Sequence, residues 1–213
     1  MYDLPLEPAK SLTREQYEKI LKMIIKEKRK DWISDLALIM TTEYCGLRSC
    51  EIGLLKKIYY DRRNHTIFCP RAKNSNSNTL KIMDPCLLKI LDYYLENNDK
   101  VRNSEYIFPG VTGCGCSRDY ASDHFMWYVN HADFFLPEYT TIHTLKHTRG
   151  QYLADMGLDI KEVQYWLGHK SVRNTLIYFQ FSKIQQDNMY KKVKKLATSK
   201  NDYLHIENML ESL

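Results

Sequence analysis

Residues 58–83 constrain the fold more than any other segment, because a pattern typical of β-strands appears there between stretches with helical periodicity. β-Branched and aromatic residues form three short runs, separated by polar turns at 61–64 and 74–78. Short turns between such runs favour antiparallel neighbours, so the segment predicts a small three-stranded antiparallel sheet with Lys73 at the end of its second strand. The predicted strands are residues 58–60, 66–69 and 79–83.

Helical periodicity predicts that the rest of the chain is mainly α-helical. Thr13, followed three residues later by Gln16, is typical of a capping box at the start of the first helix. Gly46 ends the second helix, so Arg48 is expected at the start of a short third helix. The predicted helices begin at 13 and cover 32–44, 50–55, 84–94, 119–132, 144–156, 159–167 and 171–180, with a helical tail from Lys183 and a weaker amphipathic segment over 203–213. The expected fold class is therefore α+β, mainly α, as one domain with no second domain ahead of residue 11.

The composition fits a soluble globular protein of one generous domain or two small ones. The chain has 213 residues, of which 44% are hydrophobic and 27% are charged. No run approaches the roughly 18 uncharged apolar residues of a membrane helix, and the N-terminus lacks the basic-then-apolar layout of a signal peptide. We therefore expect a cytoplasmic protein with no membrane partner.

The net charge of +5 permits nucleic-acid binding without requiring it, since only clustered charge is informative. Basic clusters lie at 26–30 and 191–195. Each of these clusters is either a solvated helix face or a contact to DNA, and the sequence leaves both interpretations open.

The six cysteines are scattered along the chain and need not form disulfides in a protein of this size. Cys114 and Cys116, with His124 and His131 downstream, look like half of a metal site, but their spacing matches no zinc pattern. Reduced thiols are expected, with no metal and no other cofactor.

Two separated blocks of polar residues carry the strongest functional signal. The first is Gly46-Leu47-Arg48-Ser49-Cys50-Glu51, and the second runs from His143, Lys146 and His147 through Leu167-Gly168-His169 to Tyr178. In this order the residues resemble the catalytic motifs of the tyrosine recombinase (phage-type integrase) family, and the resemblance covers residues 11–182. It implies the catalytic-domain fold of DNA breaking–rejoining enzymes, and cleavage of DNA by a tyrosine hydroxyl.

Cleavage of a phosphodiester without a metal needs a nucleophile, cations around the phosphorane and a proton donor for the leaving oxygen. The resemblance implies that Tyr178 is the nucleophile. Among 16 tyrosines, its position nine residues after His169 is what selects it, and Tyr165 and Tyr190 are the alternatives.

Arg48 is the first implied cation, because a guanidinium clasps two phosphate oxygens at once. Glu51, one helical turn later, is expected to orient Arg48, although a plain surface ion pair has the same spacing. The resemblance places the general acid at Lys73, on the hairpin between the second and third strands. Lys81 and Arg71 are nearby alternatives for that proton donor.

His143 and Lys146 lie one helical turn apart, so both are expected to face the same phosphate. The family usually has arginine at the second of these positions. Lysine keeps the charge but loses the two-pronged hydrogen bond, and Arg149 is a candidate to compensate. His147 is expected to support the packing. His169 is expected to donate to a phosphoryl oxygen, or else to be a helix C-terminal histidine favoured by the helix dipole.

The resemblance also implies an organisation and a partner. It implies a catalytic domain at 11–182, an N-terminal extension at 1–10 and a helical tail at 183–213 that docks on a neighbouring protomer. With no room for the family's separate DNA-clamping domain, the chain resembles the short, single-domain type typified by fimbrial-switch invertases. A fragment of a longer integrase is the alternative. The implied partner is double-stranded DNA, bound by a homotetramer that is a monomer or weak oligomer when free. The implied reaction is integration, inversion or resolution through a 3′-phosphotyrosyl intermediate, with no cofactor.

Two other functions remain open at this point. Lys146 in place of the usual arginine suggests a catalytically impaired DNA-binding relative. Basic runs that are only solvated faces suggest a helical protein-interaction module.

Overall fold

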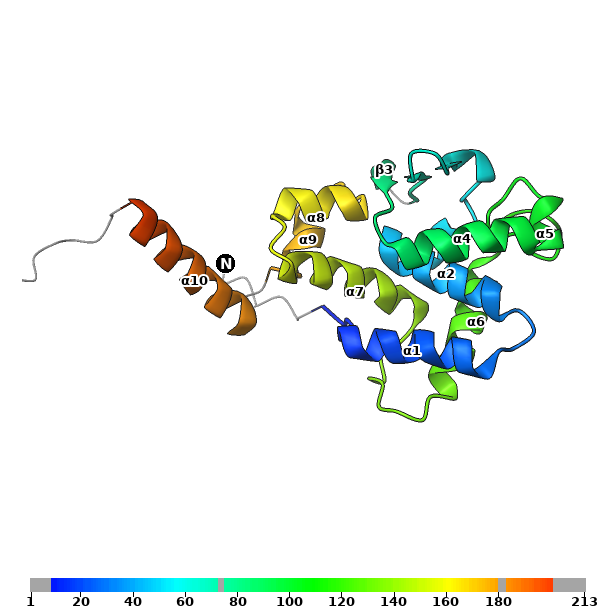
Figure 1. Ribbon diagram of the computed structural model, residues 1–213, viewed down its shortest axis with the longest axis horizontal. Helices are drawn as coiled ribbons and strands as arrows, with labels where there is room; N and C mark the ends of the chain where they lie inside the picture. Colours follow the sequence, from blue (N-terminus) through cyan, green and yellow to red (C-terminus); the bar gives the residue numbers. More distant parts are fainter. Residues whose placement is uncertain (1–8, 73–74, 180–182, 201–213) are drawn as a thin grey trace, which may run out of the picture. The chain divides into compact units, whose positions relative to one another are not determined.

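The helix α2 (Trp32–Cys45) forms the centre of the fold. Every residue from Asp35 to Cys45 is buried, as expected of a helix that is apolar on all sides. It packs against α1 (Arg14–Glu27), α4 (Pro85–Asn97) and α7 (Ile142–Asp155), which lie around it in Figure 1. The predicted helix over 32–44 is therefore confirmed, and it carries much of the core.

The computed structural model describes residues 9–72, 75–179 and 183–200. The chain divides into two units, residues 1–178 and 179–213. In the second unit the described residues include the helix α10 (Lys183–Lys200), so the helical tail predicted from Lys183 is confirmed over these residues. The amphipathic segment predicted over 203–213 lies outside the described residues. Across the described ranges, no helix combines the length and apolarity that a membrane span needs.

Helix starts and ends follow the predicted capping signals. The Thr13 hydroxyl accepts from Gln16 N at 3.2 Å, and Thr13 N donates to the Gln16 side chain at 2.9 Å, which is the predicted capping box. Gly46 ends α2 with a φ of +59°, a conformation that glycine adopts without strain. Asp84 caps α4 through Cys86 N and Leu87 N. The remaining helices of the first unit include α3 (Ser49–Ile52), α5 (Asp99–Arg102), α6 (Arg118–Asn130), α8 (Ile160–Leu167) and α9 (Arg173–Leu176).

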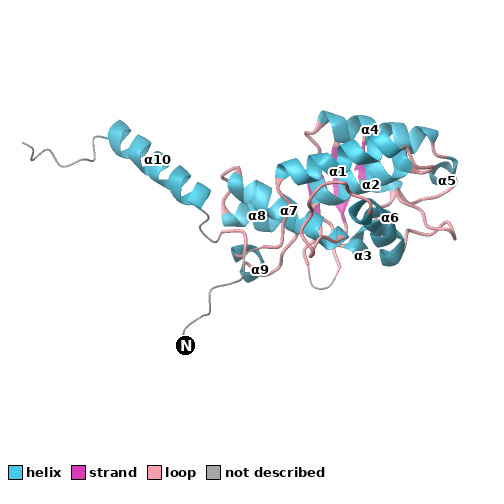
Figure 2. Ribbon diagram, turned by 90° about the horizontal axis from the view of Figure 1, so that it is seen from below, coloured by secondary structure: helices cyan, strands magenta, loops and turns pink. Residues whose placement is uncertain are grey.

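A three-stranded antiparallel sheet lies within this helical unit, as predicted, and Figure 2 shows its strands in magenta. Its order is β1 (Tyr60–Asp61), β2 (Thr66–Cys69) and β3 (Asn78–Lys81), with Ile67 opposite Leu80. The first predicted strand is mostly wrong, because Lys57–Tyr59 forms a 3₁₀ turn, η1. The backbone at residues 55–57 bonds instead to residues 105–107, with Lys57 N donating to Glu105 O at 2.7 Å, so the chain must turn before it reaches β2.

Two predicted helices are shorter in the structure. The helix α3 ends at Ile52, because the next residues bond across the fold, where Ile107 N donates to Leu55 O at 2.8 Å. The helix predicted over 171–180 is reduced to α9, which ends at Leu176. Tyr178 follows in a tighter turn, in which its N–H donates to Thr175 O at 3.1 Å. The nucleophile predicted from the sequence therefore lies just beyond a helix rather than within one.

Candidate active site

A cleft of about 360 Å³ brings together residues from four parts of the first unit. They come from the start of α3, from α7, from the turn after α8, and from α9 with the residues that follow it. Six residues singled out in the sequence line this cleft, and Lys73 lies outside the described residues. The lining residues are Arg48, His143, Lys146, His147, His169, Arg173, Asn174, Ile177 and Tyr178.

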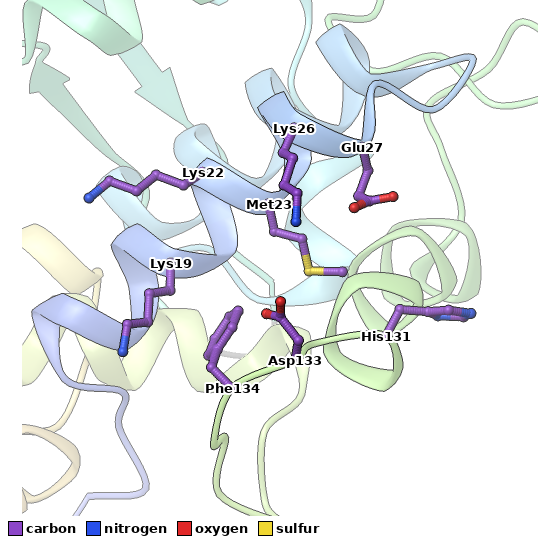
Figure 3. A pocket seen from close by; sticks show the side chains of 8 residues that line it. All are labelled: Lys19, Lys22, Met23, Lys26, Glu27, His131, Asp133 and Phe134. Atoms are coloured by element: carbon purple, nitrogen blue, oxygen red, sulfur yellow. The ribbon is translucent and has the colours of Figure 1, made fainter.

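A second cavity, of about 470 Å³, lies between α1 and the segment after α6 (Figure 3). Met23 and Phe134 contribute its apolar surface, while the three lysines of α1 that line it are accompanied by Glu27 and Asp133. Opposite charges offset one another there, and its lining combines no tyrosine with the cations that phosphate chemistry needs. The smaller cleft is therefore the better candidate, despite its volume.

Tyr178 is almost completely buried at the base of the cleft, with an exposed fraction of 1%. Its Oη lies 3.0 Å from Nδ1 of His147. Gly150 makes room for the ring, because a Cβ at that position would lie 2.5 Å from Cζ of Tyr178. Burial raises the pKa of the phenol, against the opposing effect of Arg48, so the hydroxyl is neutral and needs a base to become a nucleophile.

His147 is the base that the geometry offers. Burial, with smaller effects from His143 and Lys146, lowers the pKa of His147 to about 4, so its ring is neutral at pH 7 and has a nitrogen that can accept a proton. The sequence predicted only a packing role for His147. Its place one turn after His143, on the same helix face, is the signal that both face one cleft.

Arg48 caps the start of α3 and is held by Glu51. The Glu51 carboxylate accepts from Arg48 N at 2.9 Å and from Arg48 Nη1 at 2.7 Å, while Nη1 also contacts Ser75 Oγ at 2.9 Å. Burial opposes ionisation of Glu51, but Lys146, the Arg48 amide and Arg71 together lower its pKa. An ionised Glu51 therefore fixes the direction of a guanidinium that remains partly exposed to the cleft.

Lys146 is buried, with an exposed fraction of 2%, and its ammonium donates to two backbone carbonyls. Nζ lies 2.6 Å from Gly46 O and 2.9 Å from Leu167 O, which leaves one of three N–H groups for the cleft. Burial, followed by repulsion from Arg71, lowers the pKa of Lys146 well below its usual value. Arg149 does not compensate at this cleft, because it forms a buried ion pair with Glu43 at 2.7 Å.

His169 and His143 also line the cleft. The Thr175 hydroxyl lies 3.0 Å from Nδ1 of His169, which leaves Nε2 as the ring nitrogen for the cleft. Burial, then Lys146 and Arg48, lowers the pKa of His169 to about 3, so it is neutral at pH 7. Gly168, with a φ of +67°, ends α8 and allows the tight turn that the sequence predicted before His169.

The alternative residues lie elsewhere or are already bonded. Tyr165 has an exposed fraction of 59% and donates to Thr79 O at 3.1 Å, outside the cleft lining. Tyr190 belongs to α10, in the other unit. Lys81 is an exposed residue of β3 and is not among the residues that line the cleft. Arg71 has every N–H group paired with a protein acceptor, so it has no spare donor for a leaving oxygen.

The residues weighed as half of a metal site do not gather. His124 Nδ1 lies 2.5 Å from the buried Asp35 carboxylate, and His131 stacks on Trp127. Among the residues that the structure describes, no group of three or more His, Cys, Asp or Glu side chains is arranged to hold a metal ion.

Comparison with known proteins finds one family model and several solved structures that match most of this chain. The model of the phage integrase family matches residues 10–185. The tyrosine recombinase XerA of Thermococcus onnurineus is 31% identical over 182 residues, which are 82% of this chain and 59% of the relative. XerA of Pyrococcus furiosus is 29% identical over 82% of this chain and 58% of the relative. The chain thus spans about three fifths of the length of these curated relatives.

Solved structures share the same fold at lower identity. A crystal structure of XerA recombinase has a TM-score of 0.71 and 21% identity, over 88% of this chain and 66% of that one. The Tn1549 transposon integrase in complex with transposon right end DNA has a TM-score of 0.73 and 21% identity, over 92% and 68%. The XerH site-specific recombinase bound to its difH substrate, before cleavage, has a TM-score of 0.69 and 22% identity, over 89% and 56%.

Proposed function

Because this chain belongs to the phage integrase family of tyrosine recombinases, we propose that it cleaves and rejoins DNA strands through a phosphotyrosyl intermediate at Tyr178. The observation that carries the proposal is the 3.0 Å contact between Tyr178 Oη and His147 Nδ1, at the base of a cleft lined by Arg48 and Lys146. A nucleophile, its base and the cations for a phosphate are thus within one site.

The proposed cleavage step begins when Tyr178 Oη attacks the phosphorus and its proton passes to His147 Nδ1. The bond from phosphorus to the 5′-oxygen breaks, and that oxygen leaves with a proton supplied by Lys73. The products are a 3′-phosphotyrosyl bond and a free 5′-hydroxyl. Attack by the 5′-hydroxyl of the partner strand reverses these steps, so the bond energy is conserved and no nucleotide is needed.

Arg48, Lys146 and His169 are proposed to stabilise the phosphorane, whose equatorial oxygens carry the developing charge. Arg48 is fixed by Glu51, Lys146 by two carbonyls and His169 by Thr175. Groups fixed in this way need little reorganisation during the reaction, which is the basis of electrostatic catalysis. His143 lines the same cleft and is proposed to bind the same phosphate.

Double-stranded DNA is the proposed partner, since recombinases of this fold have been solved in complex with DNA. The proposed organisation is an N-terminal extension at 1–10, a catalytic domain at 11–182 and a tail at 183–213 that docks on a neighbouring protomer. The proposed assembly is a homotetramer on DNA that acts in the cytoplasm.

A nicked suicide duplex tests the proposal against the two other functions. After cleavage the short fragment diffuses away, so an active enzyme is trapped as a covalent adduct that resists denaturant. An impaired DNA-binding relative binds the duplex with a salt-dependent affinity but forms no adduct. A protein-interaction module shows neither result.

A series of substitutions at Lys146 tests whether its ammonium acts at the phosphate. Lys146→Ala is expected to slow single-turnover cleavage by about 10²–10³-fold, as loss of a fixed charge donor does. Lys146→Arg is expected to cleave more slowly than the parent, because extra atoms in a packed site typically cost about 1–3 kcal/mol. Lys161→Ala, on the exposed start of α8, is the control. An Ala variant as fast as the parent would show that Lys146 has no role at the phosphate.

Cleavage is expected to proceed in EDTA at the rate seen with Mg²⁺, because an amino-acid side chain fills each role in the proposed mechanism. Adduct formation on the suicide duplex, measured with either additive at equal ionic strength, checks this. A strict requirement for the divalent ion would contradict the mechanism.

A further inference from the structure

Arg71 is a buried arginine that no proposed catalytic step uses. It follows β2 by two residues, and its side chain has an exposed fraction of 0%. Withdrawing a guanidinium from water is costly unless each of its N–H groups finds an acceptor. The acceptors that its N–H groups bind therefore decide whether Arg71 can remain charged in this position.

Each of the five N–H groups of Arg71 has an acceptor. Nε donates to Asn78 Oδ1 at 3.2 Å. Nη1 donates to Gly46 O at 2.9 Å and to Glu51 Oε2 at 3.4 Å. Nη2 donates to Cys45 O at 2.8 Å and to Trp166 O at 2.9 Å. Because the guanidinium is planar and rigid, these bonds fix the mutual positions of all the acceptors.

Four of these five acceptors belong to the two segments that carry proposed phosphate-binding residues, and the fifth, Asn78, is in β3. Cys45 and Gly46 immediately precede the segment with Arg48, and Glu51 is the carboxylate that orients Arg48. Trp166 lies at the end of α8, three residues before His169. Arg71 therefore joins the turn that holds Arg48 to the turn that holds His169.

Two further contacts close the same junction. Asn78, which accepts from Arg71, donates to Tyr165 O at 2.6 Å and to Trp166 O at 3.1 Å. Gly168 packs so closely here that a Cβ would lie 2.9 Å from Nε of Arg71 and 2.6 Å from Asn76 O. Arg71 thus supplies hydrogen bonds to the end of α8, and the absence of a side chain at Gly168 leaves room for the Arg71 guanidinium.

We infer that Arg71 is a positioning residue, whose guanidinium sets the distance between Arg48 and His169 without touching the substrate. The inference rests on the proposed function, since that function places a phosphate between these two residues. Without the Arg71 guanidinium, the turn that holds Arg48 and the turn that holds His169 can separate. A displacement of about 1 Å at a catalytic group costs about 10²-fold in rate.

The charge on the scissile phosphate provides a readout that general loss of structure does not change. A methylphosphonate, in which a methyl group replaces one non-bridging oxygen, carries one negative charge fewer. Misplacement of Arg48 therefore matters less on this substrate. Arg71→Gln and Arg71→Lys are compared with Arg48→Ala on nicked duplexes that contain either group. Arg62→Gln is the control, because Arg62 is an exposed arginine paired with Asp92 and Glu96.

Arg71→Gln is expected to slow single-turnover cleavage of the phosphate by about 10²-fold and of the methylphosphonate by less than about 10-fold, each relative to the parent. Arg48→Ala is expected to show the same selectivity, and Arg62→Gln is expected to match the parent on both substrates. Arg71→Lys is expected to resemble Arg71→Gln, because an ammonium has three donors for five acceptors. Duplex affinity is expected to stay within about threefold of the parent, because phosphate contacts outside the cleft supply most of it.

Equal slowing of Arg71→Gln on both substrates would overturn the inference, and so would a parent-like rate for Arg71→Lys. Should Arg71→Gln fail to fold in a thermal melt, the two-substrate comparison with Arg71→Lys decides in the same way. A failure of the proposed function is distinguished by the adduct assay. In that case Tyr178→Phe would still form an adduct, or the parent would form none.

Discussion

Tyr178→Phe is expected to abolish covalent attachment to DNA while leaving duplex binding unchanged. The substitution removes one oxygen, the Oη that lies 3.0 Å from His147 Nδ1. The ring keeps its place over Gly150 and nearly parallel to His169, so the cleft keeps its shape. The measurement is adduct formation on a nicked suicide duplex under denaturing conditions, with duplex affinity determined in parallel.

Two matched variants control for the loss of a tyrosine hydroxyl as such. Tyr165→Phe removes a hydroxyl outside the cleft lining, and Tyr190→Phe removes one from α10. Both are expected to form adducts at the parental rate. An adduct formed by Tyr178→Phe, and lost in either of the other variants, would assign the nucleophile to that other tyrosine.

Arg48→Ala is expected to reduce single-turnover cleavage by about 10²–10³-fold, the range for loss of one preorganised donor to a developing oxyanion. The fold is expected to survive, because Glu51 keeps its bonds to the backbone amides of residue 48 and of Ala72. Duplex affinity is expected to fall little, since a single phosphate contact is lost among many.

Arg118→Ala is the control for this loss of charge, since Arg118 is an exposed arginine on α6 that pairs with Asp119 and is not among the residues that line the cleft. Its cleavage rate is expected to equal that of the parent. A loss below about tenfold in Arg48→Ala would mean that Arg48 is not a phosphate ligand in the transition state.

Local signals were sufficient for much of the fold. The capping box at Thr13, the glycine that ends α2 and the residue runs and turn that predicted β2 and β3 each depend on residues a few positions apart. The first predicted strand was mostly wrong because the backbone just ahead of it, at residues 55–57, bonds to residues 105–107, about fifty positions away. A pattern among neighbouring residues cannot indicate a backbone pairing over that distance.

The candidate site, like the fold, was predicted only in part from the sequence. The order of Arg48, Lys146, His169 and Tyr178 pointed to one cleft, and the structure brings these four residues together. The contact between His147 and Tyr178, and the five bonds of Arg71, join segments that are distant in sequence. Arg71 and Lys81 have the same charge and lie near the same hairpin, so only the burial of Arg71 distinguishes a structural cation from a solvated one.

The space beneath the Tyr178 ring has a consequence for how this gene can change over generations. Gly150 has no functional group and contributes no chemistry, yet a single added methyl group would lie only 2.5–2.8 Å from Cζ, Cε2 and Cε1 of the ring. A one-carbon change there displaces the proposed nucleophile while every proposed catalytic side chain stays in the sequence. An inactive descendant of this family member can therefore arise with all of its motifs unaltered, and an inventory of those motifs would count it as active.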